Sequence, residues 1–128
     1  MASKPNVGMG KWVLVVDDRR AVCSLVERVL GRDGFNVRTA MDGQSALAIA
    51  QSDPPRMAIV DYVLPGNMTG LELLGLIKKL WPDTKCVLMS GAYCDFRNLS
   101  ESAAVDAVLI KPFEVEDLRR TVMALTER

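Results

Sequence analysis

The sequence predicts an α/β fold, a doubly wound parallel five-stranded sheet with helices on both faces. Short apolar runs rich in Val, Ile and Leu alternate with segments of helical spacing, and Gly, Pro and Asp separate them. The strand–helix pair recurs along the chain, which implies parallel βαβ units with right-handed crossovers. Because the chain has 128 residues, these units fit one domain of ordinary size with a substantial core.

The first half of the chain contains three expected strands. The run from Trp12 to Val16 is apolar throughout and suits a strand buried on both faces, whereas residues 35–39 alternate like a more exposed strand. Between them, apolar side chains recur at helical spacing until Gly31 and Gly34. The expected order is a strand at 12–16, a helix at 20–30, a strand at 35–39, a helix at 44–51 and a strand at 57–60.

The second half begins with a loop at residues 62–69, where Pro65 and Gly66 favour a turn. The buried face expected for the following helix consists of Leu71, Leu74, Ile77 and Leu80. A polar segment at residues 94–103 is also expected to be helical. The other expected elements are strands at 85–89 and 107–110 and an amphipathic helix at 113–125.

This succession is that of a flavodoxin-like (βα)5 sheet with strand order 2-1-3-4-5. In such sheets the functional crevice lies beyond the carboxyl ends of the strands, at the topological switch point. Residues 1–10 are polar and contain Pro and Gly, so we expect a flexible N-terminal segment or an expression remnant. Residues 11–128 are expected to form the folded domain.

Composition and charge narrow the function. Lys and Arg together number 16, as do Asp and Glu, so the formal net charge is zero and nothing favours direct nucleic-acid binding or an anionic membrane. No segment has the apolar core of a signal peptide or the roughly 18 apolar residues of a membrane span. Cys23, Cys86 and Cys94 lack the spacing of a zinc site or a disulfide framework. We therefore expect a cytoplasmic, reduced location, with Cys23 and Cys86 as small core residues.

The chain contains no histidine. It therefore cannot use an imidazole as a general base, a zinc ligand or a phosphoryl donor. Any chemistry must come from carboxylates, Lys, hydroxyls, backbone amides or a bound cation.

Polar residues stand at the carboxyl ends of four expected strands. They are Asp17 and Asp18, Asp61, Ser90, and Lys111. Crowded carboxylates repel one another unless a divalent cation neutralises them, and hard oxygen ligands suit Mg²⁺. With a Lys and a hydroxyl beside them, they make a site for a phosphoryl group.

Each of these residues also has an ordinary structural interpretation. Asp18 could cap a helix and Asp61 a loop, Ser90 could open a simple turn, and Lys111 could be a surface residue. Their coincidence at four strand ends favours the functional interpretation, because one reaction needs all of these residue types together.

Four segments resemble the receiver domains of bacterial response regulators and hybrid sensor kinases. They are VLVVDD at 13–18, IVDYVLPGNMTGLELL at 59–74, VLMSGA at 87–92 and LIKPF at 109–113, within a resemblance that covers roughly residues 11–125. The resemblance implies a two-component signalling switch and not a turnover enzyme, since such a domain catalyses only its own phosphorylation and dephosphorylation. It also implies a histidine kinase or histidine phosphotransfer protein as donor and a downstream output protein or domain as reader.

The resemblance assigns the phosphoryl chemistry to three side chains. Asp61 would be the acceptor, a carboxylate nucleophile that forms an acyl phosphate. Lys111 would pair with the phosphoryl group, and Ser90 would donate a hydrogen bond to it. The bond between Lys111 and Pro112 would be cis, a geometry that has a physical basis only before proline.

The implied cofactor is Mg²⁺. Asp18 and Asp61 would bind the ion directly, Asp17 largely through water, and the backbone carbonyl of Val63 would complete the protein's share of the ligands. These roles are what the resemblance implies for the matching positions.

Two positions depart from the family's common pattern. Relatives often carry Tyr or Phe three residues before the Lys, and here that position is Val108, which has no ring to bury. The loop after Asp61 has four residues between Pro65 and Gly70, whereas chemotaxis-type members have three. The longer form is often found in receivers of hybrid sensor kinases.

Three other functions compete with this interpretation. Phosphohydrolases of the haloacid dehalogenase type place two Asp two positions apart after the first strand, whereas Asp17 and Asp18 are adjacent and residue 19 is Arg. A flavodoxin-like FMN carrier shares the fold, but no loop here resembles its phosphate-binding loop. The remaining alternative is a receiver-like protein interaction module that is not phosphorylated, although every expected site residue is present.

Overall fold

The computed structural model describes residues 12–91 and 103–126. Within these residues the sheet has five parallel strands in the order β2-β1-β3-β4-β5. The predicted fold class and strand order are thus confirmed. The expected flexible segment at 1–10 and nearly all of the expected helix at 94–103 lie outside the described residues.

Every strand and helix expected within the described residues is present, with ends shifted by at most two residues. The strands are β1 (Trp12–Val16), β2 (Asn36–Ala40), β3 (Met57–Asp61), β4 (Lys85–Ser90) and β5 (Ala107–Ile110). The helices are α1 (Arg20–Arg32), α2 (Gly43–Ser52), α3 (Gly70–Leu80) and α5 (Val115–Thr126).

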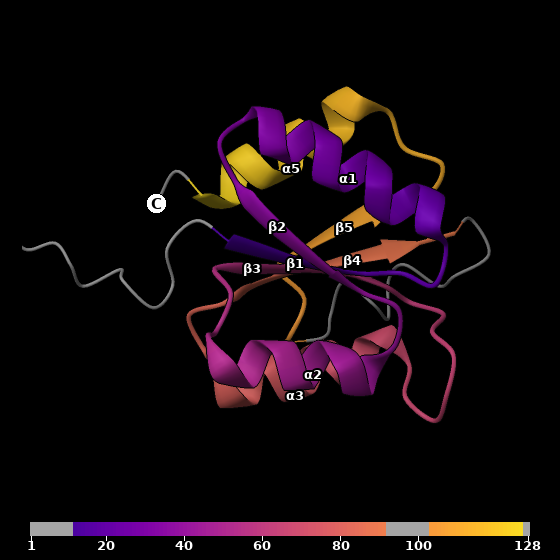
Figure 1. Cartoon of the computed structure of the whole chain (residues 1–128), viewed down its shortest axis with the longest axis vertical. Helices are drawn as coiled ribbons and strands as arrows, with labels where there is room; N and C mark the ends of the chain where they lie inside the picture. Colours follow the sequence, from indigo (N-terminus) through magenta and orange to yellow (C-terminus); the bar gives the residue numbers. More distant parts are fainter. Residues whose placement is uncertain (1–11, 92–102, 127–128) are drawn as a thin grey trace, which may run out of the picture.

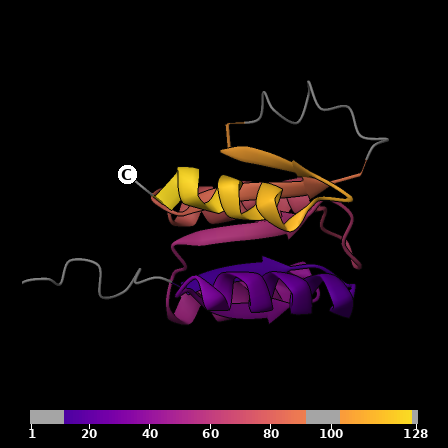
Figure 2. The ribbon, with the colours of Figure 1, turned by 90° about the horizontal axis from the view of Figure 1, so that it is seen from above.

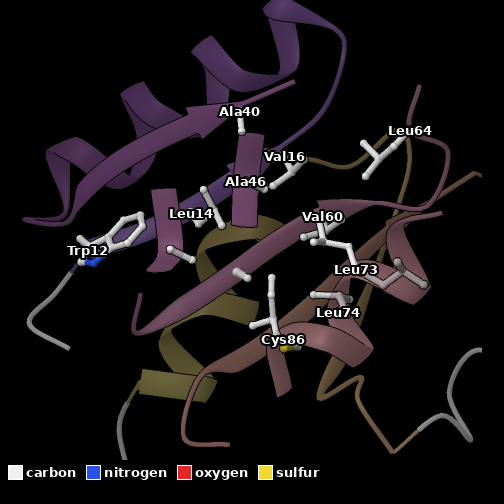
Figure 3. Packing of buried hydrophobic residues seen from close by; sticks show 14 residues of the cluster. Trp12, Leu14, Val16, Ala40, Ala46, Val60, Leu64, Leu73, Leu74 and Cys86 are labelled. Carbon is white, nitrogen blue, oxygen red and sulfur yellow. The ribbon is translucent and has the colours of Figure 1, made fainter. Parts of the chain in front are cut away.

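Helices cover both faces of the sheet, with α1 and α5 on one side and α2 and α3 on the other (Figure 1). Alternate residues of β1 face the two layers: Leu14 and Val16 pack under α2 and α3, whereas Val13 and Val15 pack under α1 and α5. Figure 3 shows the first of these clusters. β1 and β3 are buried along their whole length, and the edge strand β2 is largely exposed, as the sequence pattern predicted.

The buried face of α3 differs from the predicted one. It consists of Gly70, Leu73, Leu74 and Ile77, while Leu71 is half-buried and Leu80 is 51% exposed. The predicted set was spaced by three residues throughout. Each such step falls about 60° short of a full helical turn, so the set drifts to the opposite side of the helix after three steps.

The helix α1 is two residues longer than the predicted 20–30 and buries one narrow face. Its buried residues are Cys23, Val26 and Leu30, whereas Ala21 is exposed and Leu25 is half-buried. The helix runs past Gly31 and ends before Gly34, whose φ of 96° reverses the chain toward β2. Cys23 and Cys86 are both buried free thiols, as predicted.

A membrane-spanning helix is not found among the described residues, since none of their helices is both long and apolar enough.

Candidate functional site

The sheet brings the predicted site residues together at the carboxyl ends of its strands. The strand arrowheads point to the same side of the molecule in Figure 2. Asp61 is the last residue of β3 and Ser90 the last of β4, while Asp17 follows β1 and Lys111 follows β5. The backbone amide of Lys111 donates to the Ser90 carbonyl at 2.8 Å, which sets these two residues side by side.

Asp17, Asp18 and Asp61 form an acidic cluster. Each offers a carboxylate oxygen, and these oxygens lie within 4.8 Å of one another. Asp17 is fully buried, Asp61 nearly so, and Asp18 is exposed. A set of hard oxygen ligands with one side open to solvent fits Mg²⁺, which keeps several waters when it binds protein.

Asp17 is held by donors from the protein on both of its oxygens. The Arg19 amide donates to Oδ1 at 2.8 Å, and Lys111 Nζ donates to Oδ2 at 2.7 Å. Lys111 Nζ also lies 3.4 Å from Asp61 Oδ1. The ammonium group therefore sits between the two buried carboxylates, and the interpretation of Lys111 as a plain surface residue is wrong.

The charge of Asp61 is unfavourable in this setting. Burial raises the pKa of the Asp61 carboxyl above its ordinary value, the negative charge of Asp17 adds to this, and Lys111 offsets only part of it. A further cation beside Asp61 would favour the ionised form. The electrostatics of the cluster and its set of oxygen ligands therefore both favour a bound cation.

Ser90 presents a buried hydroxyl at the end of β4. The side chain is fully buried, and its Oγ makes no hydrogen bond within the part of the chain that the structure describes. Buried hydroxyls are normally hydrogen-bonded, and exceptions often mark functional positions. Ser90 is thus a strand-end residue with unused hydrogen-bonding capacity and not part of a simple turn.

The remaining predicted features are also present at this edge. Val63 lies in the loop after β3 with its side chain 69% exposed, and Lys111 is followed by a cis peptide bond to Pro112. The N-cap residue of α1 is Arg19, which makes no side-chain cap. Asp18 is not the helix cap that its ordinary interpretation required.

A cleft of about 760 Å³ opens over the site. Its lining includes the apolar side chains of Val22, Leu25, Pro112 and Phe113, of which the sequence analysis assigned a role to Pro112 alone. Leu25 is half-buried on α1 and faces this cleft. Cys23, two residues earlier, instead packs in the core between α1 and the sheet.

Comparison with known proteins identifies the class. A family model described as the response regulator receiver domain matches residues 13–123. The chain therefore belongs to the response regulator receiver domain family, the signalling switches of two-component systems. Receiver domains generally bind Mg²⁺ through an acidic pocket, and they generally partner with histidine kinases and output domains.

Particular relatives agree with this assignment. The chain is 32% identical over 122 residues to the probable transcriptional regulatory protein TcrX of Mycobacterium tuberculosis, covering 94% of this chain but 52% of TcrX. It is 28% identical over 116 residues to sporulation initiation phosphotransferase F of Bacillus subtilis, covering 89% of this chain and 92% of that protein. The chain thus spans about half the length of TcrX and nearly all of the second relative.

Solved structures give the same result. The receiver domain of NtrX from Brucella abortus superposes with a TM-score of 0.83 at 33% identity, covering 90% of this chain and 98% of that one. The chemotaxis response regulator CheY4 of Vibrio cholerae superposes with a TM-score of 0.80 at 30% identity, covering 89% and 97%.

Proposed function

We propose that Asp61 accepts a phosphoryl group from a phosphohistidine partner in a Mg²⁺-dependent reaction, and that the change is relayed to an output protein or attached domain. The observation that carries this proposal is the site itself. Lys111 Nζ lies 2.7 Å from Asp17 and 3.4 Å from Asp61, and the neighbouring strand ends in Ser90, whose hydroxyl has no partner among residues 12–91 and 103–126.

The residues divide the chemistry among them. A carboxylate oxygen of Asp61 forms the new bond to phosphorus while the bond to the donor nitrogen breaks, and the nitrogen keeps the bonding pair. The ammonium group of Lys111 then interacts with the phosphoryl oxygens as well as with Asp17. Ser90 Oγ donates a hydrogen bond to one of these oxygens.

The metal-binding part of the proposal assigns four positions. Asp18, Asp61 and the Val63 carbonyl would hold Mg²⁺ directly, whereas Asp17 would act through water because both of its oxygens already accept hydrogen bonds. When bound, the ion supplies neutralising charge for the carboxylates and for the transferring group.

The partner would bind over the cleft beside α1 and the loop after Lys111. Val22, Leu25 and Phe113 give this surface an apolar lining around the acidic site, which suits a helical donor that brings its phosphohistidine to Asp61.

We also propose a cytoplasmic location, because Cys23 and Cys86 are free thiols. Cell fractionation that recovers the protein outside the cytoplasm would contradict it.

The test is phosphorylation in solution. Wild-type protein incubated with acetyl phosphate and Mg²⁺ should gain one base-labile phosphoryl group on the peptide that contains Asp61. Asp61→Asn and EDTA should each abolish labelling, and the exposed control Asp83→Asn should leave it unchanged. Undiminished labelling of Asp61→Asn would refute the assignment, and no labelling of the wild type from any donor would favour the interaction-module alternative.

A second arm of the same experiment tests the docking surface. Glu27 is exposed on α1 and Leu25 lines the cleft. Leu25→Asp and Glu27→Arg should slow transfer from a cognate phosphohistidine protein about tenfold or more, because the few contacts that dominate an interface each cost about 2 kcal/mol or more when lost. Labelling by acetyl phosphate should persist. Equal transfer to both variants and wild type would place the docking surface elsewhere.

A further inference from the structure

The first turn of α3 lies against the backbone of the acceptor residue. A Cβ built on Gly70, the first residue of α3, would lie only 2.7 Å from the carbonyl carbon of Asp61 and 2.9 Å from the Cα of Tyr62, and it would overlap the Asp61 carbonyl oxygen. Real Cβ atoms essentially never come within 3.0 Å of such atoms. The neighbours are backbone atoms at the end of a buried strand, so they cannot rotate away as a flexible side chain can.

Hydrogen bonds hold the turn in this place. The Gly70 amide donates to the Tyr62 carbonyl at 2.8 Å, which closes the loop after β3 at its neck. A capping box fixes the turn from the other side: Thr69 Oγ1 accepts from the Glu72 amide at 3.1 Å, and Glu72 Oε1 accepts from the Thr69 amide at 2.9 Å. Asp61 precedes Tyr62 at this neck, and Val63 follows Tyr62.

The closed neck of this loop positions two groups of the proposed site, the carboxylate of Asp61 and the carbonyl of Val63. The Asp61 carboxylate is attached to the backbone that Gly70 touches, and the Val63 carbonyl is the next but one along the loop. A side chain at position 70 must push the start of α3 and the Asp61 backbone apart. The carboxylate and the carbonyl would then move relative to Asp17 and Lys111, which are held by other strands.

We propose that Gly70 is a positioning residue. The absence of its side chain lets α3 seat directly on Asp61 and so fixes the carboxylate of Asp61 and the carbonyl of Val63. The inference rests on the proposed function, because it concerns the same acceptor and Mg²⁺ site. Gly70 itself touches neither the phosphoryl group nor the ion.

Gly75 provides a matched control in the same helix, since a Cβ built there meets nothing within 4 Å. Gly70→Ala should raise the Mg²⁺ dissociation constant, measured by calorimetry, by about 10- to 100-fold, as changes in supporting residues of metal sites do. Its rate of phosphorylation by acetyl phosphate should fall by on the order of 100-fold. Gly75→Ala should match the wild type in both measurements.

The fold of each variant is checked by circular dichroism and urea unfolding. A folded Gly70→Ala protein with wild-type Mg²⁺ affinity would overturn the inference. If Gly70→Ala does not fold, Thr69→Ala takes its place, because it frees the first turn of α3 without adding an atom. That variant should bind Mg²⁺ severalfold more weakly, and unchanged affinity would again overturn the inference.

Measurements on the wild type separate the positioning role of Gly70 from the proposed function. Mg²⁺ binding and labelling of the wild type, together with an unaffected Gly70→Ala, would refute the positioning role alone. A wild type that neither binds Mg²⁺ nor accepts a phosphoryl group would refute the proposed function, and the positioning role with it.

Discussion

At the residue scale, substitution of Ser90 should affect the stability of the fold and the rate of phosphorylation in different ways. Its buried hydroxyl has no partner among the described residues, and an unsatisfied buried polar group costs about 1–3 kcal/mol. Ser90→Ala should therefore leave the free energy of unfolding unchanged or raise it by up to about 1 kcal/mol. The same change should slow phosphorylation by about 100-fold, the usual effect of removing one donor to a developing charge.

Urea unfolding and the rate of labelling by acetyl phosphate measure the two effects. Ser52 is the control, because its hydroxyl is exposed and donates to the Ile49 carbonyl at the end of α2. Ser52→Ala should not change the labelling rate. A Ser90→Ala protein that is labelled at the wild-type rate would show that the hydroxyl does not serve the phosphoryl group.

Which residues gather at the candidate site could be predicted from the sequence, but their contacts could not. Strand ends and the topology rule were enough to select Asp17, Asp61, Ser90 and Lys111. The closer attachment of Lys111 to Asp17 than to Asp61 depends on side-chain rotamers across three strands, which no local pattern encodes. The contact of Gly70 with the Asp61 backbone was missed because it depends on how the loop after β3 closes, although a glycine at a helix start after a strand-end Asp is a usable signal.

At the element scale, a polar latch joins α3, β4 and the start of β5 at the end of the sheet opposite the site. Lys78 Nζ donates to the Thr84 carbonyl at 2.8 Å and to Asp106 Oδ2 at 2.7 Å. The Cys86 amide donates to the same Asp106 oxygen at 2.7 Å. Asp106 thereby ties the segment that enters β5 to both a strand and a helix.

The latch predicts a pH dependence of stability. Burial opposes ionisation of Asp106, but the hydrogen bonds from Lys78 and from the Cys86 amide outweigh it and hold the pKa of the carboxyl below its ordinary value. A lowered pKa in the folded state stabilises the fold above the ordinary carboxyl pKa, and this stability is lost as the pH falls through the folded-state pKa. Because Asp106 is exposed and its charge is partly screened, Asp106→Asn should lower the free energy of unfolding at pH 7 by about 1 kcal/mol.

The difference between Asp106→Asn and wild type should shrink as the pH falls below about 4, near the ordinary carboxyl pKa. Urea unfolding over a series of pH values measures it, with the exposed Asp83→Asn as a control that should track the wild type. Because the latch lies at the far end of the strands, the labelling rate of Asp106→Asn should stay at the wild-type value. A constant difference across the pH range would contradict the role given to the ionised carboxylate.

At the scale of the whole molecule, the order of elements was the most predictable feature. Continuous apolar runs at β1, β3 and β4 can only be buried on both faces by helices, and strands that alternate with helices leave few topologies. The finer packing was less predictable, because apolar residues outnumber the positions that one helix face can bury. Leu71 and Leu80 of α3 illustrate this: each is apolar, yet Gly70 and Leu73 take the buried places.

The extent of the switch is also a property of the whole molecule. Phosphorylation should pull Ser90 toward Asp61 and shift the segment that follows β4. In relatives with an aromatic residue at the position of Val108, a ring can fill the vacated space and carry the change to the outer face of the sheet. Val108 is half-buried in β5 opposite Leu88, and its stiff, short side chain cannot do so.

We therefore expect the rearrangement to be confined to residues 90–105, of which 92–102 lie outside the described part of the chain. Amide chemical shifts measured with and without beryllofluoride, a phosphoryl mimic, test this. Shifts should stay small along the last helix, over residues 114–125. Val108→Tyr is the matched variant: because coupling between sites commonly amounts to about 1–3 kcal/mol, a restored ring should spread the shifts to that helix. Large shifts over residues 114–125 in the wild type would show that Val108 does not limit how far the change travels.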